Sequence, residues 1–220
     1  MPCFLAGSSQ AQNLATVLGV PFYAFSHQQG HIAAACWSSG RMDLMDRPHL
    51  AWHLSGGTSE LLRVEPEGRR VRAQRIGGTE DLSAGQLIDR TGKLLGLPFP
   101  AGKALDTLSA GAQGREFFRV KLRGLQFSLS GLENKVQDFH AAHGDAAETA
   151  AYAIRSVIWA VLTATRAALA EEPGLPVVFS GGVASNAMLR AAAAGQDYIF
   201  CAPEYATDNA MGIAVLTARE

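Results

Sequence analysis

Two segments of this chain end an apolar run with the same Ser-Gly-Gly turn, and this repeat constrains the fold more than any other feature. Leu50–Leu54 leads into positions 55–57 in HLSGGTSELL, and Pro176–Phe179 leads into positions 180–182 in VFSGGVASNAML. Short apolar runs bounded by glycine are typical of strands buried in a sheet. The repeat therefore predicts two related lobes, each built around a buried strand that ends in a glycine turn.

Helical and extended patterns alternate along the rest of the chain. We expect helices over Ser8–Leu18, His27–Trp37, Asp81–Leu95, Ser130–Phe139 (capped by Ser130), Ala146–Leu169, Asn186–Ala193 and Thr207–Ala218. We expect strands over Pro21–Phe25, Leu50–Leu54, Glu60–Val64, Val71–Ile76, Leu125–Leu129, Pro176–Phe179 and Tyr198–Cys201, with Gly77-Gly78 breaking the chain. This mixture predicts an α/β fold in which helices cover a mixed sheet. The expected division is a first lobe at 1–76, a helical segment at 77–145 and a second lobe at 146–220.

Composition limits the function classes. Lys and Arg number 19 and Asp and Glu 20, so the net charge is −1, and RNA would need a local patch or a partner protein. The three cysteines have no CxxC spacing, which favours a reducing compartment. The longest apolar stretch, around Val157–Ala170, is interrupted by Arg166 and does not reach the ~18 residues of a membrane span. We therefore expect a cytoplasmic protein that has no membrane partner.

The glycine turns are candidate anion sites. A glycine after a strand lets the backbone approach a ligand, and successive backbone N–H groups in such a turn bind phosphate oxygens. Ser55 and Thr58 add two hydroxyls to the first turn. The same pattern is also typical of plain tight turns. Neither turn matches the Rossmann or P-loop pattern.

His27 and His31 are four residues apart and would share one face of a helix, which is the spacing of many metal-binding histidine pairs. Asp208 is the candidate third ligand, and two histidines with one carboxylate suit Fe(II) or Zn²⁺. The alternatives are a solvated histidine pair and an aspartate that caps the last helix. The remaining histidines, interpreted as surface or packing residues, are His49, His53, His140 and His143.

Three aspartates cluster around the segment near Gly102. Asp81 and Asp89 are eight residues apart and could face one side of a helix, with Asp106 on the next helix. Carboxylates of this kind bind ribose hydroxyls or metal-bound water. By themselves they are more typical of a solvated helix face with an acidic residue near the helix start, and this is the interpretation we prefer from these residues alone.

The motifs taken in order resemble one family over nearly the whole chain. They are HQQGH, LSGGT, GGTEDLSAGQLIDRTGKLLGLPFPAG, FSLSGLENK, SGGVASNAMLR and ATDNA. This series is similar to the TsaD family, formerly described as O-sialoglycoprotein endopeptidases. The resemblance implies an actin-like (ASKHA) fold with ribonuclease-H-like lobes around a nucleotide cleft. It also implies transfer of a threonylcarbamoyl group from its adenylate to the exocyclic amine of the tRNA adenosine beside the anticodon.

The resemblance also implies residue roles. It assigns one divalent metal, Fe(II) first and Zn²⁺ second, to His27, His31 and Asp208. It assigns adenine-nucleotide binding to Leu54, Ser55, Gly56, Gly57 and Thr58 of the first turn, and to Asp89, Gly102, Asp106 and Asn186. The implied partners are tRNA, TsaB-like and TsaE-like proteins, or a second copy of the chain.

Three departures from the family pattern favour a divergent member. Thr58 stands where the family usually has histidine, and the GQLIDR segment keeps Asp89 but lacks the family's preceding glutamate. The chain also starts in what looks like an interior stretch, so we expect the family's first strand unit to be missing and Met1 to be an internal methionine. Two alternatives follow: a catalytically inactive scaffold or dimer partner, and a metallo-endopeptidase, which lacks a glutamate base beside the histidines.

Overall fold

The structure, a computed structural model, describes residues 2–220, so Met1 lies outside the described residues. The helices are α1 (Pro2–Leu18), α2 (His27–Ser38), α3 (Ala84–Leu94), α4 (Gly102–Ser109), α5 (Ser130–His143), α6 (Ala146–Glu171), α7 (Ala187–Ala192) and α8 (Met211–Arg219). Short 3₁₀ turns lie at Met42–Asp46 (η1), Gly182–Ser185 (η2) and Pro203–Tyr205 (η3). The strands are β1 (His49–Leu54), β2 (Ser59–Glu67), β3 (Arg70–Thr79), β4 (Leu122–Arg123), β5 (Gln126–Phe127), β6 (Val177–Ser180) and β7 (Tyr198–Phe200).

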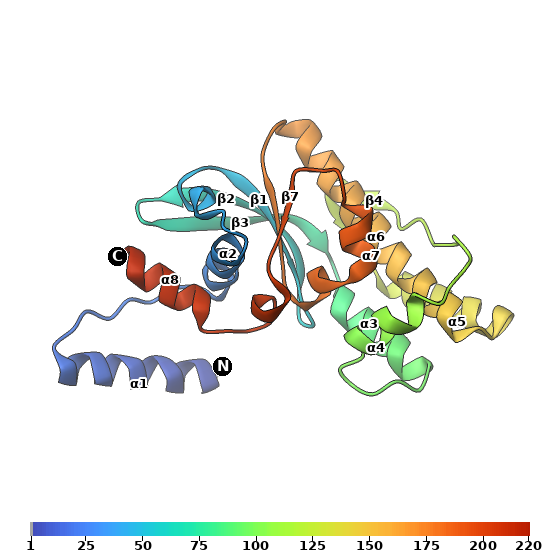
Figure 1. The fold of residues 1–220 in the computed structure, drawn as a ribbon, viewed down its shortest axis with the longest axis horizontal. Coiled ribbons are helices and arrows are strands. Elements are labelled where there is room, and N and C mark those ends of the chain that lie inside the picture. The colour runs from blue at the N-terminus through green and yellow to red at the C-terminus, as the bar shows by residue number, and fades with distance from the viewer. Residues whose placement is uncertain (1) are drawn as a thin grey trace.

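The two strands that end in glycine turns are neighbours in one sheet. The seven strands follow the order β4-β5-β3-β2-β1-β6-β7. β1, β2 and β3 are antiparallel, whereas β1 and β6 are parallel, with Trp52 opposite Phe179. Both glycine turns therefore leave the same edge of the sheet, which Figure 1 shows between α2 and α3. Strands from all three predicted segments share this sheet, and the segment boundaries stay a prediction.

Alternation along β1 sends successive side chains to opposite faces. Trp52 and its two flanking leucines pack into the core under α6, and the Trp52 indole N–H donates to the Thr165 hydroxyl at 2.8 Å. Ala51 faces the other way, into a second core with Ile32 and Cys36 of α2. The sheet is thus covered by α6 on one face and by α2 on the other.

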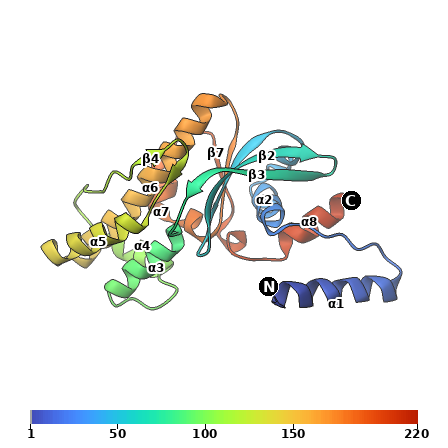
Figure 2. The ribbon, with the colours of Figure 1, turned by 180° about the vertical axis from the view of Figure 1, so that it is seen from behind.

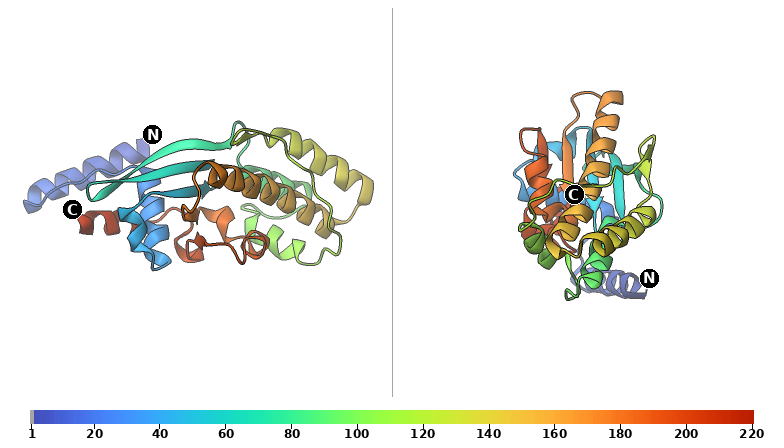
Figure 3. Two further views of the ribbon diagram at one scale, coloured as in Figure 1. Left: turned by 90° about the horizontal axis from the view of Figure 1, so that it is seen from above. Right: turned by 90° about the vertical axis from the view of Figure 1, so that its right-hand side faces the viewer.

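Two elements determine the elongated outline. α1 stands apart from the body at one end and α5 projects at the other, as Figures 2 and 3 show. Leu5, Leu14 and Val17 of α1 remain largely exposed. α6 is long and apolar enough to cross a membrane by length and composition, but 50% of its most apolar window is buried inside the fold. It is a core helix of this domain.

Two predicted features of the strands are wrong. Pro21–Phe25 is irregular rather than extended in a ladder, and Phe25 instead packs beneath the Arg70 guanidinium, 4.9 Å from its ring. Gly77-Gly78 does not break the chain but lies inside β3. A Cβ on Gly78 would come within 2.2 Å of the Ser59 carbonyl oxygen, so the glycine permits a close strand approach and a positive φ of 115°.

One predicted helix cap and one predicted helix start are also wrong. α5 has Leu129 at its N-cap, and the Ser130 hydroxyl instead donates to Asp81 at 2.6 Å. The last helix begins at Met211, so Asp208 precedes it rather than opening it. In both cases a side chain that could cap a helix is used in a tertiary contact. The predicted strand at Leu125–Leu129 shortens to Gln126–Phe127.

Candidate metal and nucleotide site

The start of α2 positions the histidine pair. The Ser26 hydroxyl accepts from the Gln29 N–H at 3.2 Å, and the Gln29 side chain accepts from the Ser26 N–H at 2.7 Å, which forms a capping box. The Gln29 amide also donates to the Val71 carbonyl of β3 at 2.7 Å. These bonds fix the first turn against the sheet, so that His27 and His31 project from one face.

A close helix crossing brings Asp208 to this face. A Cβ on Gly212 of α8 would lie 1.8 Å from the Gly30 carbonyl oxygen of α2, so the two backbones are in direct contact. The Asn209 side-chain oxygen accepts from the N–H groups of Met211 and Gly212, at 3.0 and 3.4 Å. Asn209 therefore fills the helix-start role that was the alternative for Asp208, and the Asp208 carboxylate is left to face the histidines.

The three predicted ligands lie at the separations expected for ligands of one ion. His31 Nε2 is 3.2 Å from His27 Nε2 and 3.1 Å from Asp208 Oδ1, and His27 Nε2 is 3.5 Å from Asp208 Oδ1. Ligand atoms ~2.1 Å from a common ion are ~3.0 Å apart at right angles and ~3.4 Å apart in a tetrahedron. The donor set and its spacing thus fit a divalent metal ion.

His53 lies beside this pair: it is buried, as a packing residue would be, and the rings it packs against are those of the histidine pair. Its ring centroid is 4.3 Å from that of His31 and 6.0 Å from that of His27. One nitrogen from each of the three rings lies within 4.8 Å of the others. The alternation of side chains along β1 could have predicted this position, because it places His53 on the same face as Ala51, toward α2.

Burial favours the neutral forms of His31 and His53. Burial, together with the neighbouring His31 and His27, lowers the pKa of His53 to about 4, against an opposing effect of the Asp208 carboxylate. Burial also lowers the pKa of His31, with His27 acting in the same direction and the Asp208 carboxylate opposing both. The neutral ring is the form that binds metals. The Nδ1 atoms of His31 and His53 are both buried and have no hydrogen-bond partner among the described residues.

The first glycine turn closes on itself and rests on α3. The Ser55 hydroxyl accepts from the Thr58 N–H at 3.1 Å, and the Gly56 carbonyl accepts from the Ser83 hydroxyl, the N-cap of α3, at 2.8 Å. A Cβ on Gly85 would lie 2.5 Å from the Ser55 carbonyl oxygen. The turn is therefore held in place by backbone contact with a helix start.

The histidines and both glycine turns line one open pocket of about 550 Å³. Its lining residues are His27, His31, His53, Ser55, Gly56, Gly57, Thr58, Gly182, Ala206, Thr207 and Asp208. The pocket has the size of a small-molecule site. A phosphate bound at the first turn would lie beside a metal bound by the histidines.

The other predicted nucleotide residues do not line this pocket. The Asp89 carboxylate accepts from the Ala101 N–H at 2.8 Å. Gly102, the residue after Ala101, is the first residue of α4. Asp106 accepts from the Asn186 amide at 2.8 Å and from the Ala187 N–H at 3.0 Å. These bonds connect α3 to α4 and α4 to the start of α7.

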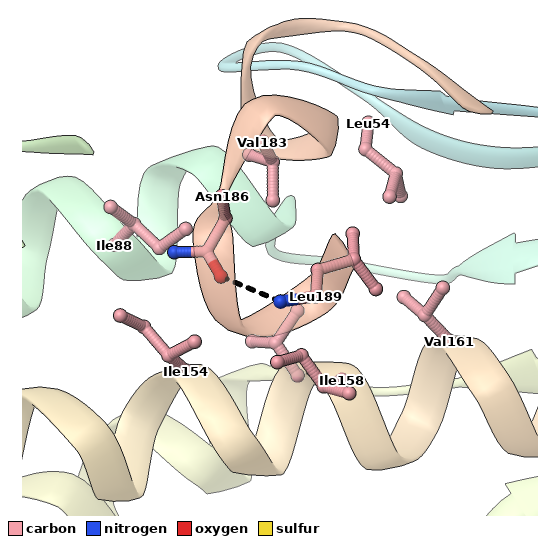
Figure 4. A pocket seen from close by; sticks show the side chains of 9 residues that line it. Leu54, Ile88, Ile154, Ile158, Val161, Val183, Asn186 and Leu189 are labelled. Atoms are coloured by element: carbon pink, nitrogen blue, oxygen red, sulfur yellow. Dashed lines mark hydrogen bonds between the residues drawn. The ribbon is translucent and has the colours of Figure 1, made fainter. Parts of the chain in front are cut away.

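Asn186 sits at the end of the second glycine turn, above α6. Its side-chain oxygen accepts from the Leu189 N–H at 3.0 Å, as Figure 4 shows. The small cavity beside it, about 10 Å³, is otherwise lined by apolar side chains such as Ile88 and Ile154. That volume is near the size of one water molecule, so the cavity as it stands does not accommodate a nucleobase.

Solved structures support the fold. The chain superimposes on full-length HypF in a phosphate- and nucleotide-bound form with a TM-score of 0.71, at 15% identity, covering 93% of this chain and 37% of that one. It superimposes on HypF of T. kodakarensis with a TM-score of 0.68, at 18% identity, covering 96% and 38%. The fold and the pocket at the strand ends define a protein of the actin-like, ASKHA class.

Sequence comparison then gives the family. The family model for TsaD, tRNA N6-adenosine threonylcarbamoyltransferase, matches residues 1–215. Relatives with that description from Geobacter sp. (strain M21) and Syntrophobacter fumaroxidans are each 34% identical, over 96% and 98% of this chain. The chain belongs to the TsaD family. It spans 64% of the Geobacter relative and 62% of a relative from Rhodospirillum rubrum, so it corresponds to less than two thirds of their length.

Proposed function

We propose that this chain takes part in transferring a threonylcarbamoyl group from threonylcarbamoyl-adenylate to the exocyclic amine of the tRNA adenosine beside the anticodon. The single observation that carries the proposal is the pocket in which His27, His31 and Asp208 lie beside the Ser55–Thr58 turn. Family membership supports the reaction class. None of the relatives named above is described as a scaffold or a peptidase.

The pocket residues would act by binding and positioning. His27, His31 and Asp208 would hold the metal, Fe(II) first and Zn²⁺ second, and a bound divalent ion would stabilise negative charge on the carbamoyl carbonyl or the phosphate. The first glycine turn would hold the adenylate phosphate through its backbone N–H groups. The amine nitrogen forms a bond to the carbamoyl carbon and releases one proton to solvent, while the bond from that carbon to the AMP phosphate oxygen breaks and AMP leaves. Because an adenosine amine is a weak nucleophile, its orientation should dominate the rate.

Asp89, Gly102, Asp106 and Asn186 would complete the adenylate site. Asp106 and Asn186 are already hydrogen-bonded to each other, so their orientation is set before a ligand arrives. Pre-set partners reduce the entropy that binding must overcome. The small volume of the cavity below Asn186 implies that the nucleoside would bind above this hydrogen-bonded pair or enlarge the cavity.

A local basic patch would contact tRNA, although the net charge of the chain is −1. Arg115, Arg155 and Arg166 line a pocket of about 330 Å³ together with Trp159. The Arg119 guanidinium lies 5.5 Å from the Trp159 ring. Arginines next to aromatic rings suit unpaired RNA bases and phosphates. TsaB-like or TsaE-like proteins, or a second copy of the chain, belong to the same proposal, as does a cytoplasmic location.

The test is a transfer assay with threonylcarbamoyl-adenylate and unmodified tRNA, run with added Fe(II) or Zn²⁺. We expect transfer by the wild-type chain, loss in His31→Ala, and retention in His143→Ala, whose exposed ring stacks on Phe139 away from the pocket. Calorimetric titration with ATP would measure nucleotide binding separately. Saturable ATP binding without transfer by the wild-type chain under either metal would refute the catalytic proposal.

A further inference from the structure

The buried side chain of His53 carries a polar atom that has no hydrogen-bond partner among the described residues. That atom is Nδ1, and the side chain is 4% exposed. A buried polar atom left unpaired destabilises the folded state. An apolar residue would fill the same position of β1 without that cost. The His53 Nδ1 atom is therefore available to a partner from outside the polypeptide.

The groups that face His53 are those of the candidate metal site. His27 and His31 reach it from α2, and one nitrogen from each ring lies within 4.8 Å of the others. Asp208 reaches the same point from the start of α8 and touches both of those histidines. Ligands of a tetrahedral ion are ~3.4 Å apart, so a side-chain rotation that shortens the present separation, at most 4.8 Å, brings the His53 nitrogen into ligand range.

The backbone of His53 is fixed by its place in the sheet. It lies opposite Glu60 on β2 and opposite Ser180 on β6, so both strand neighbours constrain it. A ligand on the central part of a sheet is more rigidly placed than one on a loop. Asp208 lies outside the sheet, before α8, and its side chain is 83% exposed.

We propose that His53 is a direct ligand of the metal ion held by His27, His31 and Asp208, which gives the site three imidazoles and one carboxylate. This inference rests on the metal site of the proposed function. Two histidines and one carboxylate with open positions are typical of Fe(II), whereas four protein ligands complete the tetrahedron that Zn²⁺ prefers. This ligand set favours Zn²⁺, the second metal of the proposed function, and the substrate oxygen would then enter as a fifth ligand.

Cobalt(II) tests the coordination directly, because four-coordinate Co(II) absorbs visible light much more strongly than six-coordinate Co(II). The full chain, stripped of metal, would be titrated with Co(II) and then with Zn²⁺ against a competing chelator. We expect an intense visible band in the wild-type chain and a weak one in His53→Leu. Zn²⁺ affinity should fall in His53→Leu by at least the ~10–100-fold that follows loss of an outer-sphere partner. His143→Leu, which changes an exposed histidine, is the matched control.

A ligating replacement separates direct coordination from a structural role. His53→Cys places a thiolate on the same strand and should restore the intense band and add a sulfur-to-cobalt charge-transfer band. Circular dichroism of each variant checks folding. The inference fails if His53→Leu binds Co(II) and Zn²⁺ as the wild type does while His31→Ala loses both. Absence of metal binding by the wild-type chain would refute the metal site itself and this inference with it.

Discussion

Replacing Gly212 with alanine tests whether the crossing of α2 and α8 holds the metal site together. The added methyl would lie 1.8 Å from the Gly30 carbonyl oxygen, whereas ordinary contact begins near 3.4 Å. The helices must therefore separate by about 1.6 Å, and the clash is with backbone rather than with a flexible side chain. Overpacking of this kind costs about 1–3 kcal/mol, offset by up to about 1 kcal/mol of better helix propensity.

The separation should affect metal binding more than stability. Asp208 precedes α8 by three residues and would move with it, while His31 stays on α2. Metal–ligand distances tolerate only about 0.2 Å of error, so a shift of more than 1 Å removes the carboxylate from the ion. We expect Gly212→Ala to fold, to melt several degrees lower, and to bind Zn²⁺ at least ~10-fold more weakly.

The assay is chelator competition for Zn²⁺ together with thermal melting, with Gly30→Ala as the matched control. A methyl on Gly30 would meet the Ile213 Cδ1 atom at 3.2 Å, the mobile end of a side chain, so the helices need not separate. Gly30→Ala should bind Zn²⁺ nearly as well as the wild-type chain. Wild-type affinity in Gly212→Ala would refute the argument that backbone contact at this crossing positions Asp208.

Three further predictions concern the nucleotide side of the pocket and its supports. Gly85→Ala would place a methyl 2.5 Å from the Ser55 carbonyl oxygen and should weaken ATP binding in calorimetry. Gly111→Ala is the control, because its methyl meets neighbours only at 3.5 Å or more and should leave ATP affinity unchanged. Equal affinities in the two variants would contradict the role of the turn. Asn186→Ala removes the α7 cap and the hydrogen bond to Asp106, so the free energy of unfolding in urea should fall by about 1–2 kcal/mol. A fall of less than a few tenths of a kcal/mol would show that other groups replace these bonds. Burial acts to raise the pKa of Asp81, but hydrogen bonds from two serine hydroxyls and two backbone N–H groups outweigh it and hold the pKa below its usual range. Its ionised form therefore stabilises the fold above about pH 4 and loses that contribution as the pH falls further, so the urea midpoint of the wild type should drop more steeply from pH 6 to pH 3 than that of Asp81→Asn. Parallel pH profiles would exclude that contribution.

Local sequence determined the elements that carry the site. The i, i+4 spacing of His27 and His31 places both rings on one helical face whatever that helix packs against. The apolar runs that end at Ser55 and Ser180 form β1 and β6, and the strands predicted at Glu60–Val64 and Val71–Ile76 were confirmed as parts of β2 and β3, which pair as a hairpin. The series of motifs was sufficient to indicate the family.

Local sequence was misleading where tertiary contacts compete for the same groups. Ser130 has the chemistry of a helix cap, yet its hydroxyl bonds to Asp81, 49 residues earlier in the chain. The aromatic segment Pro21–Phe25 favours a strand, but no neighbouring strand pairs with it among the described residues. A propensity states only what a segment prefers in isolation, and packing overrides it.

The sequence by itself determined the histidine pair, the glycine turns and the strands that carry them, because spacing and periodicity are properties of a single segment. Only the tertiary structure decided that Asp208 reaches His31 across 177 residues, through the glycine contact between α2 and α8. Only the tertiary structure decided that His53 belongs to the same cluster. The pleat of β1 says that His53 and Ala51 share a face, but it does not say which helix covers that face; that depends on how the whole sheet buries its apolar surface.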